Sequence, residues 1–318
     1  MKKIFRLMLA VAAIASVVSC AKEAATAVPA GEEVEVSFVA NLGGALGSRA
    51  IADGTTVNEV AWAVYESGST YHLPSLKGTL TLQDKKATLN TRLVTGKTYD
   101  IAFFAYKKDD VNGGPLHYNI LWDEQKVCMK LDPKQANDET RDCFWHVEKG
   151  IAVNGPVEGE YTLTRPLAQL NLGVTTTDIE DARKAGFSVT DSQITVNTYT
   201  QFNMFTGAVT DEKSIPVTFD RADSPIDSKN VLNIKDDTTD YKYLATTYVL
   251  VNEKETCDVS VTLWANDGSE LNTLTYSFVP FQRNHRTNIL GALLTNPATF
   301  SIVVDDKFAN DFNGPDFQ

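Results

Sequence analysis

The sequence predicts an all-β protein built from two tandem β-sandwich domains, and three observations lead to this fold class. Many short stretches alternate β-branched or aromatic residues with polar ones, which is the period of a strand with one buried face. Gly, Asn and Asp residues separate these stretches, and "NDG" at Asn266–Gly268 is typical of a tight hairpin turn. The 318 residues are enough for two domains of ordinary size. One short helix and a long irregular excursion in the first domain complete the predicted architecture.

Residues 1–20 have the pattern of an export signal and are left out of the predicted fold. Basic residues precede an apolar run, Leu7–Ser19, that is long enough for a signal peptide and too short to span a bilayer. The run ends in "VVSC", where a small residue precedes Cys20 in a pattern that resembles the lipobox of bacterial lipoproteins. This resemblance implies a cleaved signal peptide and a lipid, such as palmitate, on Cys20 that tethers the chain to the outer membrane. The alternative is an ordinary signal peptide with an incidental cysteine.

A propeptide is predicted over residues 21–49, and it contains one clear strand. Glu33–Leu42 ("EVEVSFVANL") alternates in the manner of a half-buried strand. Its inward-facing residues are Val34, Val36, Phe38, Ala40 and Leu42. Beyond the strand, Arg49 stands alone among glycines, alanines and a serine, in a segment able to enter a protease cleft extended, with Arg49–Ala50 as the bond to be cut. Two interpretations stay open, a processing site and a simple linker, and under the second the strand is a permanent part of the first sheet.

Residues 50–165 are expected to form the first sandwich. The strand patterns are Glu59–Glu66, Lys77–Leu82, Lys86–Val94 and Tyr99–Tyr106. Residues Gly113–Gly150 lack clear periodicity and are predicted to form the irregular excursion, and Ile151–Glu160 is only weakly patterned. The boundary between the domains is placed near Arg165 and Pro166.

Residues 166–318 are expected to form the second sandwich. Its strand patterns are Ala168–Val174, Ser192–Tyr199, Tyr243–Val251, Asp258–Ala265 and Leu274–Val279, and Thr177–Phe187 is predicted as the short helix. Near the end, Ala298–Phe308 alternates again, with Phe300, Ile302 and Val304 on one face. The tail beyond carries spaced phenylalanines at positions 308, 312 and 317, which either anchor a groove elsewhere or cover the domain's own core.

Composition and motifs exclude several classes of function. The net charge of −12 argues against nucleic acid as a partner. The four histidines are scattered, and no metal-binding, phosphate-binding or nucleophile motif occurs, so we expect no enzyme activity, no metal and no cofactor. Cys128 and Cys143 could pair in an oxidising compartment, or these two and Cys257 could remain thiols.

Taken in order, these features resemble the fimbrillins, which are the lipoprotein precursors of type V pili and related surface lipoproteins with transthyretin-like sandwiches. The resemblance rests on the lipobox, on Arg49 after the glycine-rich segment, and on several phrases of modest specificity. These phrases are "LVTGKTYDIAFFAY", "RPLAQLNLGV", "FNMFTGAV" and "RNHRTNILGALLT". It implies that a trypsin-like protease cuts at Arg49–Ala50, that the strand Glu33–Leu42 leaves, and that the C-terminal region of another pilin subunit fills the groove. A host or bacterial surface ligand would then be bound by the fibre.

The competing prediction is a surface lipoprotein that does not polymerise and acts as a glycan- or protein-binding module. Trp122 and Trp145 lie in the excursion, and exposed indole rings could stack on sugars. Buried, the same two rings would only be core residues. The paired acids of the chain look like turn residues and lack the ligand spacing of a calcium loop.

Overall fold

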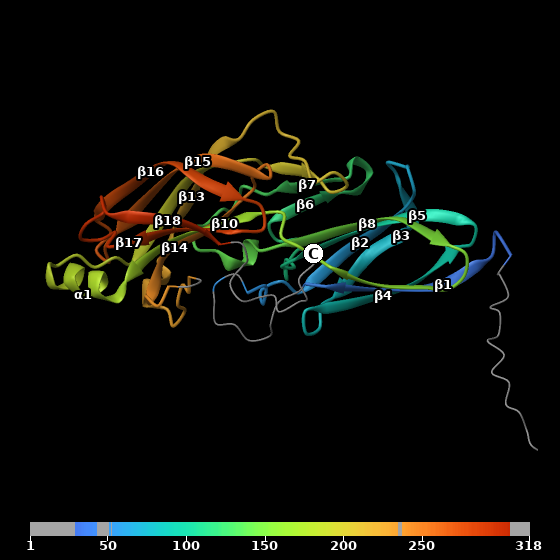
Figure 1. Cartoon of the computed structure of the whole chain (residues 1–318), viewed down its shortest axis with the longest axis horizontal. Helices are drawn as coiled ribbons and strands as arrows, with labels where there is room; N and C mark the ends of the chain where they lie inside the picture. The colour runs from blue at the N-terminus through green and yellow to red at the C-terminus, as the bar shows by residue number, and fades with distance from the viewer. Residues whose placement is uncertain (1–28, 43–50, 52, 235–236, 306–318) are drawn as a thin grey trace, which may run out of the picture.

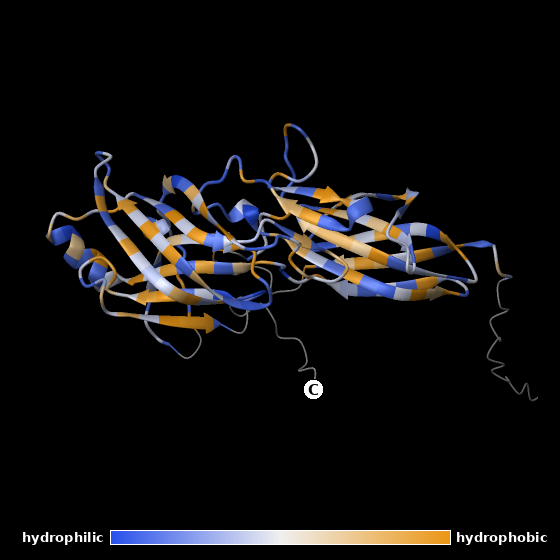
Figure 2. Cartoon of the chain, turned by 90° about the horizontal axis from the view of Figure 1, so that it is seen from above, coloured by the Kyte–Doolittle hydropathy of each residue, from blue (hydrophilic) through white to orange (hydrophobic). Residues whose placement is uncertain are grey.

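The computed structural model describes residues 29–42, 51, 53–234 and 237–305, and in these residues nearly all regular structure is β (Figure 1). Two β lobes lie end to end along the long axis of the molecule, as the labels in Figure 1 show. Hydrophobic and hydrophilic residues alternate along many of the strands (Figure 2), which is the pattern from which the sequence predicts them. The predicted all-β fold with two sandwiches is confirmed.

The first lobe is a sandwich of two sheets. Its strands are β1 (Glu33–Asn41), β2 (Glu59–Glu66), β3 (His72–Thr81), β4 (Lys86–Val94), β5 (Lys97–Tyr106), β8 (Phe144–Val153) and β9 (Val157–Thr162). One sheet has the order β4-β1-β9 and the other the order β3-β2-β5-β8. Their facing side chains form one apolar cluster, to which β1 contributes every second residue.

The second lobe is a sandwich of the same kind. Its strands are β10 (Ala168–Thr175), β11 (Asp191–Thr198), β13 (Ile215–Asp223), β14 (Tyr241–Val249), β15 (Lys254–Trp264), β16 (Glu270–Gln282), β17 (Arg286–Gly291) and β18 (Phe300–Asp305). The sheet orders are β14-β10-β17-β18 and β13-β11-β15-β16. The predicted boundary residues Arg165 and Pro166 lie in the link between β9 and β10.

The two lobes repeat one pairing scheme. In the first lobe β1 pairs antiparallel with β4 and parallel with β9, and in the second lobe β10 does the same with β14 and β17. The other sheets agree as well, since β3-β2-β5-β8 matches β13-β11-β15-β16 with antiparallel pairing throughout. Among the described residues, β18 has no counterpart in the first lobe. The second lobe is therefore the first-lobe scheme with one strand added to an edge.

The segment expected to be an irregular excursion of the first domain contains short strands that join the two lobes. β6 (Tyr118–Leu121) pairs with β7 (Lys126–Met129), and β7 pairs with β12 (Gln201–Asn203) of the second lobe. Beneath this sheet lies a third apolar cluster that draws on both lobes, with Phe104 and Tyr118 from one side and Tyr243 and Tyr248 from the other. Ile151–Glu160, weakly patterned in sequence, contains the end of β8 and the start of β9.

The helix α1 (Thr176–Lys184) lies close to the predicted place and begins one residue earlier. The Thr175 side chain caps it by accepting from the amide of Asp178. At the far end Gly186 has a φ of +84°, a left-handed conformation that glycine adopts without strain. Short 3₁₀ turns occur at Trp122–Glu124, Glu139–Arg141 and Pro225–Asp227. No helix in the described part of the chain has the length and apolarity to cross a membrane.

The three cysteines of the body are free thiols, so the alternative of a Cys128–Cys143 disulfide is wrong. Cys143 and Cys257 are buried, and Cys128 on β7 is half-buried. Burial raises the pKa of all three thiols, to about 12 for Cys257, so little reactive thiolate is present near neutral pH.

We expect slow alkylation at Cys128 in the native protein, no alkylation at the two buried cysteines, and rapid alkylation of all three in denaturant without reductant. Peptide mass spectrometry measures each site. A Cys128–Cys143 crosslinked peptide from the unreduced protein would contradict this assignment.

Candidate functional site

The strand β1, which lies just upstream of Arg49 in sequence, occupies the middle of its sheet. It pairs with β4 along its whole length, from Glu33 opposite Val94 to Asn41 opposite Lys86. On its other side it pairs with β9 from Val36 to Asn41. Among the described residues, only β1 joins β4 to β9. Removing β1 would therefore split this sheet into two separate strands.

The inward side chains of β1 fill the core of the first lobe, as the sequence predicts. Val34, Val36, Phe38, Ala40 and Leu42 are all buried, and Phe38 and Ala40 have no exposed area. The Phe38 ring stacks on Tyr161 of β9, with 5.9 Å between the ring centroids. Opposite Phe38 stands Gly159, where a Cβ would come within 2.7 Å of the Tyr161 hydroxyl and 3.3 Å of the Phe38 ring. We call the groove that β1 fills between β4 and β9 the β1 slot. The β1 slot is thus shaped around one large aromatic side chain.

Polar contacts fix the two ends of β1. At the start, the Thr95 hydroxyl donates to the carbonyl of Pro29 (2.6 Å), and the Gly31 amide donates to the carbonyl of Thr95 (3.0 Å). At the end, the Leu42 amide donates to the carbonyl of Lys85 (3.0 Å). Lys86 binds Glu160 across the sheet (2.8 Å), and this hydrogen bond holds the pKa of Glu160 below its usual range. Because that pair is exposed, it contributes little to stability.

The residues predicted to be processed lie outside the described residues. These are Cys20, Arg49 and Ala50. The described chain reaches Leu42, one residue beyond the end of β1, and continues at Ile51, a buried member of the cluster shared by the two lobes.

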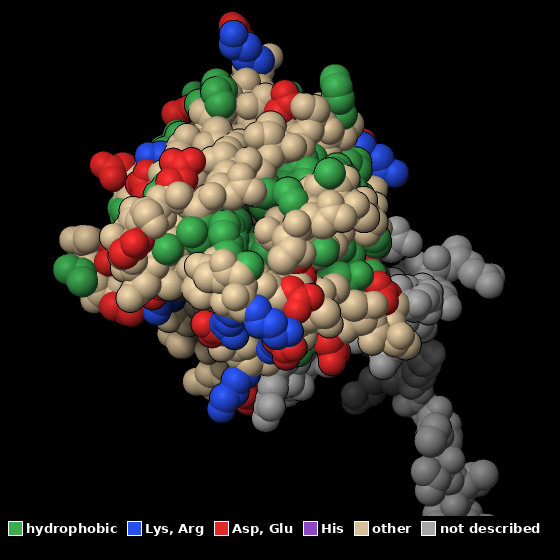
Figure 3. Space-filling model, turned by 90° about the vertical axis from the view of Figure 1, so that its left-hand side faces the viewer, with side chains coloured by type: hydrophobic (Ala, Val, Ile, Leu, Met, Phe, Trp, Pro, Cys, Tyr) green, Lys and Arg blue, Asp and Glu red, His purple; other side chains and the backbone are tan. Residues whose placement is uncertain are grey.

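The predicted donor residues lie in β18, at the edge of the second lobe's own sheet. Among the described strands, β18 pairs with β17 alone, from Gly291 opposite Phe300 to Arg286 opposite Asp305. Ile302 and Val304 are half-buried, and Phe300 is 43% exposed although it contacts Tyr276 of β16 edge to face. Figure 3 views this end of the molecule, where hydrophobic side chains gather in a band across the surface. β18 is therefore held less completely than β1.

A buried polar cluster holds the end of β18. The Arg286 guanidinium donates Nη2–H to the Asp305 carboxylate (2.8 Å), and the Asn288 amide donates to the same oxygen (3.0 Å). All three side chains are buried, and Asn288 is held in turn by Asn171 of β10 (2.8 Å). We call Arg286, Asn288 and Asp305 the β18 clasp.

Sequence reasoning missed both the β18 clasp and a hollow between the lobes that Trp145 helps to line. Trp122 lines a different hollow, together with Tyr106, Tyr118 and Lys77. Both indole rings are partly buried, between the two alternatives considered from the sequence. In the described ranges, no group of His, Cys, Asp or Glu side chains is arranged to hold a metal ion.

Comparison with known proteins places the chain in a family. A model of a family of unknown function, DUF6562, matches residues 29–317. The chain belongs to this family. The DUF6562 match runs from the start of the described residues through β18 and includes both lobes. No curated protein matches the chain.

Several solved structures are similar to this DUF6562 protein. A protein described as a candidate for cell adhesion, from Bacteroides uniformis, is 12% identical, with 85% of this chain and 97% of that chain covered and a TM-score of 0.45. A fimbrial assembly protein from Parabacteroides distasonis is 12% identical, with coverages of 86% and 96% and a TM-score of 0.44. A fimbrilin from Porphyromonas gingivalis is 12% identical, with coverages of 81% and 89% and a TM-score of 0.46. The descriptions of these structures name cell adhesion and fimbriae.

Proposed function

We propose that this protein is a fimbrial subunit that is exported as a lipoprotein precursor and polymerises by strand exchange after cleavage at Arg49–Ala50. The observation that carries the proposal is the place of β1, a strand upstream of Arg49 that is central in its sheet and fills the core of the first lobe. A cut between β1 and the remaining chain would make this strand a separate, replaceable piece. The fibre would stand on the cell surface and serve adhesion.

An emptied β1 slot would be unstable until another strand filled it. The inward Val, Phe and Leu side chains of β1 each contribute about 1.5–3 kcal/mol through burial. Their loss would also leave main-chain groups of β4 and β9 without partners on that side. While β1 remains covalently attached, its high effective concentration keeps the slot filled. Cleavage removes this advantage and allows a strand from another subunit to compete.

The described strand that suits the donor role best is β18. In the described part of the chain the first lobe forms a sandwich without an equivalent of β18, so the second lobe could release β18 and keep the same pairing scheme. In its own sheet, β18 has one described neighbouring strand, and its Ile302 and Val304 side chains are half-buried. In the β1 slot it would have two neighbouring strands, β4 and β9. Its alternating Phe300, Ile302 and Val304 match the period of the inward side chains of β1. The tail beyond Asp305 would extend the donor.

Exchange of this kind would produce a fibre rather than a closed dimer. Donor and acceptor are different surfaces on opposite lobes, so each added subunit leaves a free donor and a free slot. The partners proposed are therefore other pilin subunits, a trypsin-like protease, and the outer membrane through lipid on Cys20. A ligand on a host or bacterial surface would be bound by the assembled fibre.

Trypsin treatment of the purified precursor tests the proposal. We expect a discrete cut after Arg49, release of the N-terminal segment, and a ladder of SDS-resistant oligomers on gels. Arg49→Gln is expected to stay uncut and monomeric. Ile302→Asp is expected to be cut normally and to form no ladder, because a carboxylate cannot enter the apolar slot without a large desolvation cost. If protein cut at Arg49 remains monomeric and keeps its fold, the polymer proposal is wrong.

A further inference from the structure

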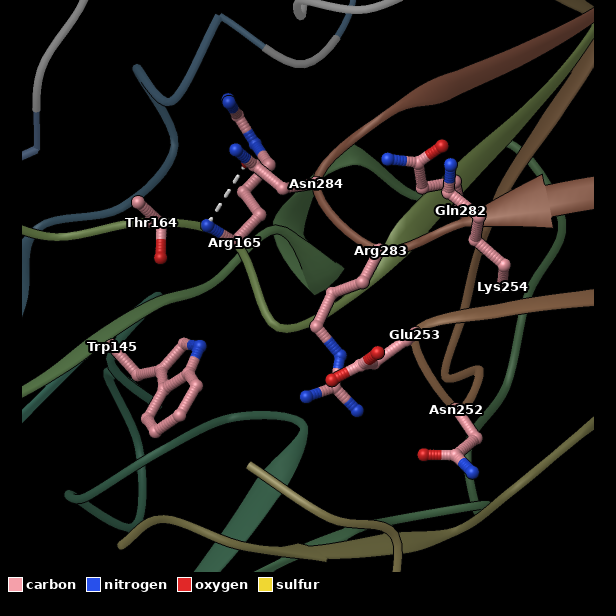
Figure 4. A pocket seen from close by; sticks show the side chains of 9 residues that line it. All are labelled: Trp145, Thr164, Arg165, Asn252, Glu253, Lys254, Gln282, Arg283 and Asn284. Carbon is pink, nitrogen blue, oxygen red and sulfur yellow. Dashed lines mark hydrogen bonds between the residues drawn. The ribbon is translucent and has the colours of Figure 1, made fainter. Parts of the chain in front are cut away.

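A hollow of about 730 Å³ lies where the two lobes meet, and strand exchange makes no use of it. Four separate segments line it. They are Trp145 on β8, Thr164–Arg165 in the link between the lobes, Asn252–Lys254 before and at the start of β15, and Gln282–Asn284 at and after the end of β16 (Figure 4). Trp145 and Arg283 flank the open centre of the hollow in this view. The hollow exists only because the two lobes are docked.

Two N–H donors at the hollow lack an acceptor among the described residues. The indole Nε1 of Trp145 is buried and unpaired. Arg283 donates Nη1–H to the carbonyl of Gly207 and Nη2–H to the carbonyl of Val251 (3.0 Å), and its Nε is buried and unpaired. Buried donors in native proteins nearly always have a partner, and an acceptor on a molecule bound in the hollow would supply one for these two.

The charges at the hollow favour an anion. Arg283 and Lys254 are basic and Glu253 is the one acidic residue among the lining side chains, on a protein whose net charge is −12. Arg165 is neutralised by Asp142, whose carboxylate accepts from its Nε (2.8 Å) and Nη2 (2.9 Å). Burial lowers the pKa of Arg283 because it separates the charge from water, and the nearby carboxylates of Glu253 and Glu255 offset this lowering only in part. A carboxylate on a ligand would supply the remaining compensation.

The remaining lining groups suit the hydroxyls of a sugar. The side-chain amides of Asn252 and Gln282 both donate and accept, and the Glu253 carboxylate accepts. The indole of Trp145 offers an N–H together with an apolar surface. We infer that the hollow binds an acidic saccharide, a sugar ring bearing a carboxylate, with the carboxylate toward Arg283 and Lys254 and the hydroxyls toward Trp145 and the amides. This binding does not require cleavage or polymerisation.

Saturation-transfer NMR and titration on the uncut, full chain test the inference. The probes are 3′-sialyllactose and trigalacturonate, with lactose and maltotriose as their neutral controls. We expect an acidic probe to bind and the neutral probes to bind at least tenfold more weakly, since a hydrogen bond to a charged group is worth roughly tenfold in affinity. Trp145→Phe, which keeps an aromatic ring but removes the N–H, and Arg283→Lys are each expected to weaken binding by about tenfold.

The matched control is Trp122→Phe, which makes the same change at the other hollow and should leave binding unaltered. Melting curves show whether each variant is folded, and if Arg283→Lys is not, Trp145→Phe and the exposed Lys254→Gln carry the test. Failure of both acidic probes to bind, equal binding of neutral and acidic probes, or full binding by folded Trp145→Phe would each overturn the inference. None of these results depends on whether the protein forms a ladder after trypsin.

Discussion

Replacing Phe38 by alanine is expected to lower the free energy of unfolding of the first lobe by about 3–5 kcal/mol. Phe38 is fully buried in the middle of β1, stacks on Tyr161, and stands opposite Gly159, which has no side chain to fill the space. The cavity would therefore collapse poorly. Urea unfolding of the uncut protein, followed by circular dichroism, measures the loss.

The matched controls lie on the same strand. Glu35 is exposed, and Glu35→Ala should change stability by no more than about 0.5 kcal/mol. Val39→Ala, on the face opposite Phe38, should also have a smaller effect than Phe38→Ala, because Val39 is only half-buried. If Phe38→Ala is no more destabilising than these two changes, β1 does not hold the first lobe together. Filling the β1 slot with another strand would then add little stability.

The strand β1 could be predicted from sequence because its signal is local. Five alternating apolar residues specify a strand with one buried face, and the structure confirms that each of them is buried. That β1 is central, with β4 on one side and β9 on the other, could not be predicted, because β9 lies more than a hundred residues further along the chain. The repeat of the pairing scheme was hidden for the same reason, since it is a property of pairings and leaves no short repeat in the sequence.

The segment Gly113–Gly150 was expected to be irregular because its strands are short and their partners are distant. β6 and β7 have four residues each, too few for alternation to be recognised, and β7 is completed by β12 from the other lobe. The interlobe hollow is likewise assembled from four segments, none of which carries a motif of its own. At the C-terminus the alternation of β18 is visible in the sequence, but nothing local marks Asp305 as part of a buried ion pair. In the fold it is buried against Arg286, a partner on the neighbouring strand.

Replacing Asp305 by alanine is expected to loosen β18 from the second lobe. The change leaves the Arg286 guanidinium buried without its carboxylate, and the carbonyl of Asn233 (3.2 Å) remains as an acceptor. Removing one partner of a buried ion pair typically costs about 3–5 kcal/mol when the other charge stays buried. In this lobe, detachment of the edge strand β18 is expected to cost less free energy than keeping the charge buried. Detachment exposes Arg286 to water, while the other seven strands of the lobe keep their pairing with one another.

Hydrogen exchange of the uncut protein measures this release. We expect the amides of Ile302 and Val304 to lose protection in Asp305→Ala, while those of β10 and β15 keep it. Ser301→Ala, an exposed change on the same strand, is the control and should leave exchange unaltered. Once β1 has been cut away, the same variant should polymerise faster than the parent, because the donor no longer has to break the β18 clasp. Unchanged protection of β18 in Asp305→Ala would mean that the clasp does not hold the strand, and faster exchange with slower polymerisation would mean that Asp305 is needed in the acceptor slot instead.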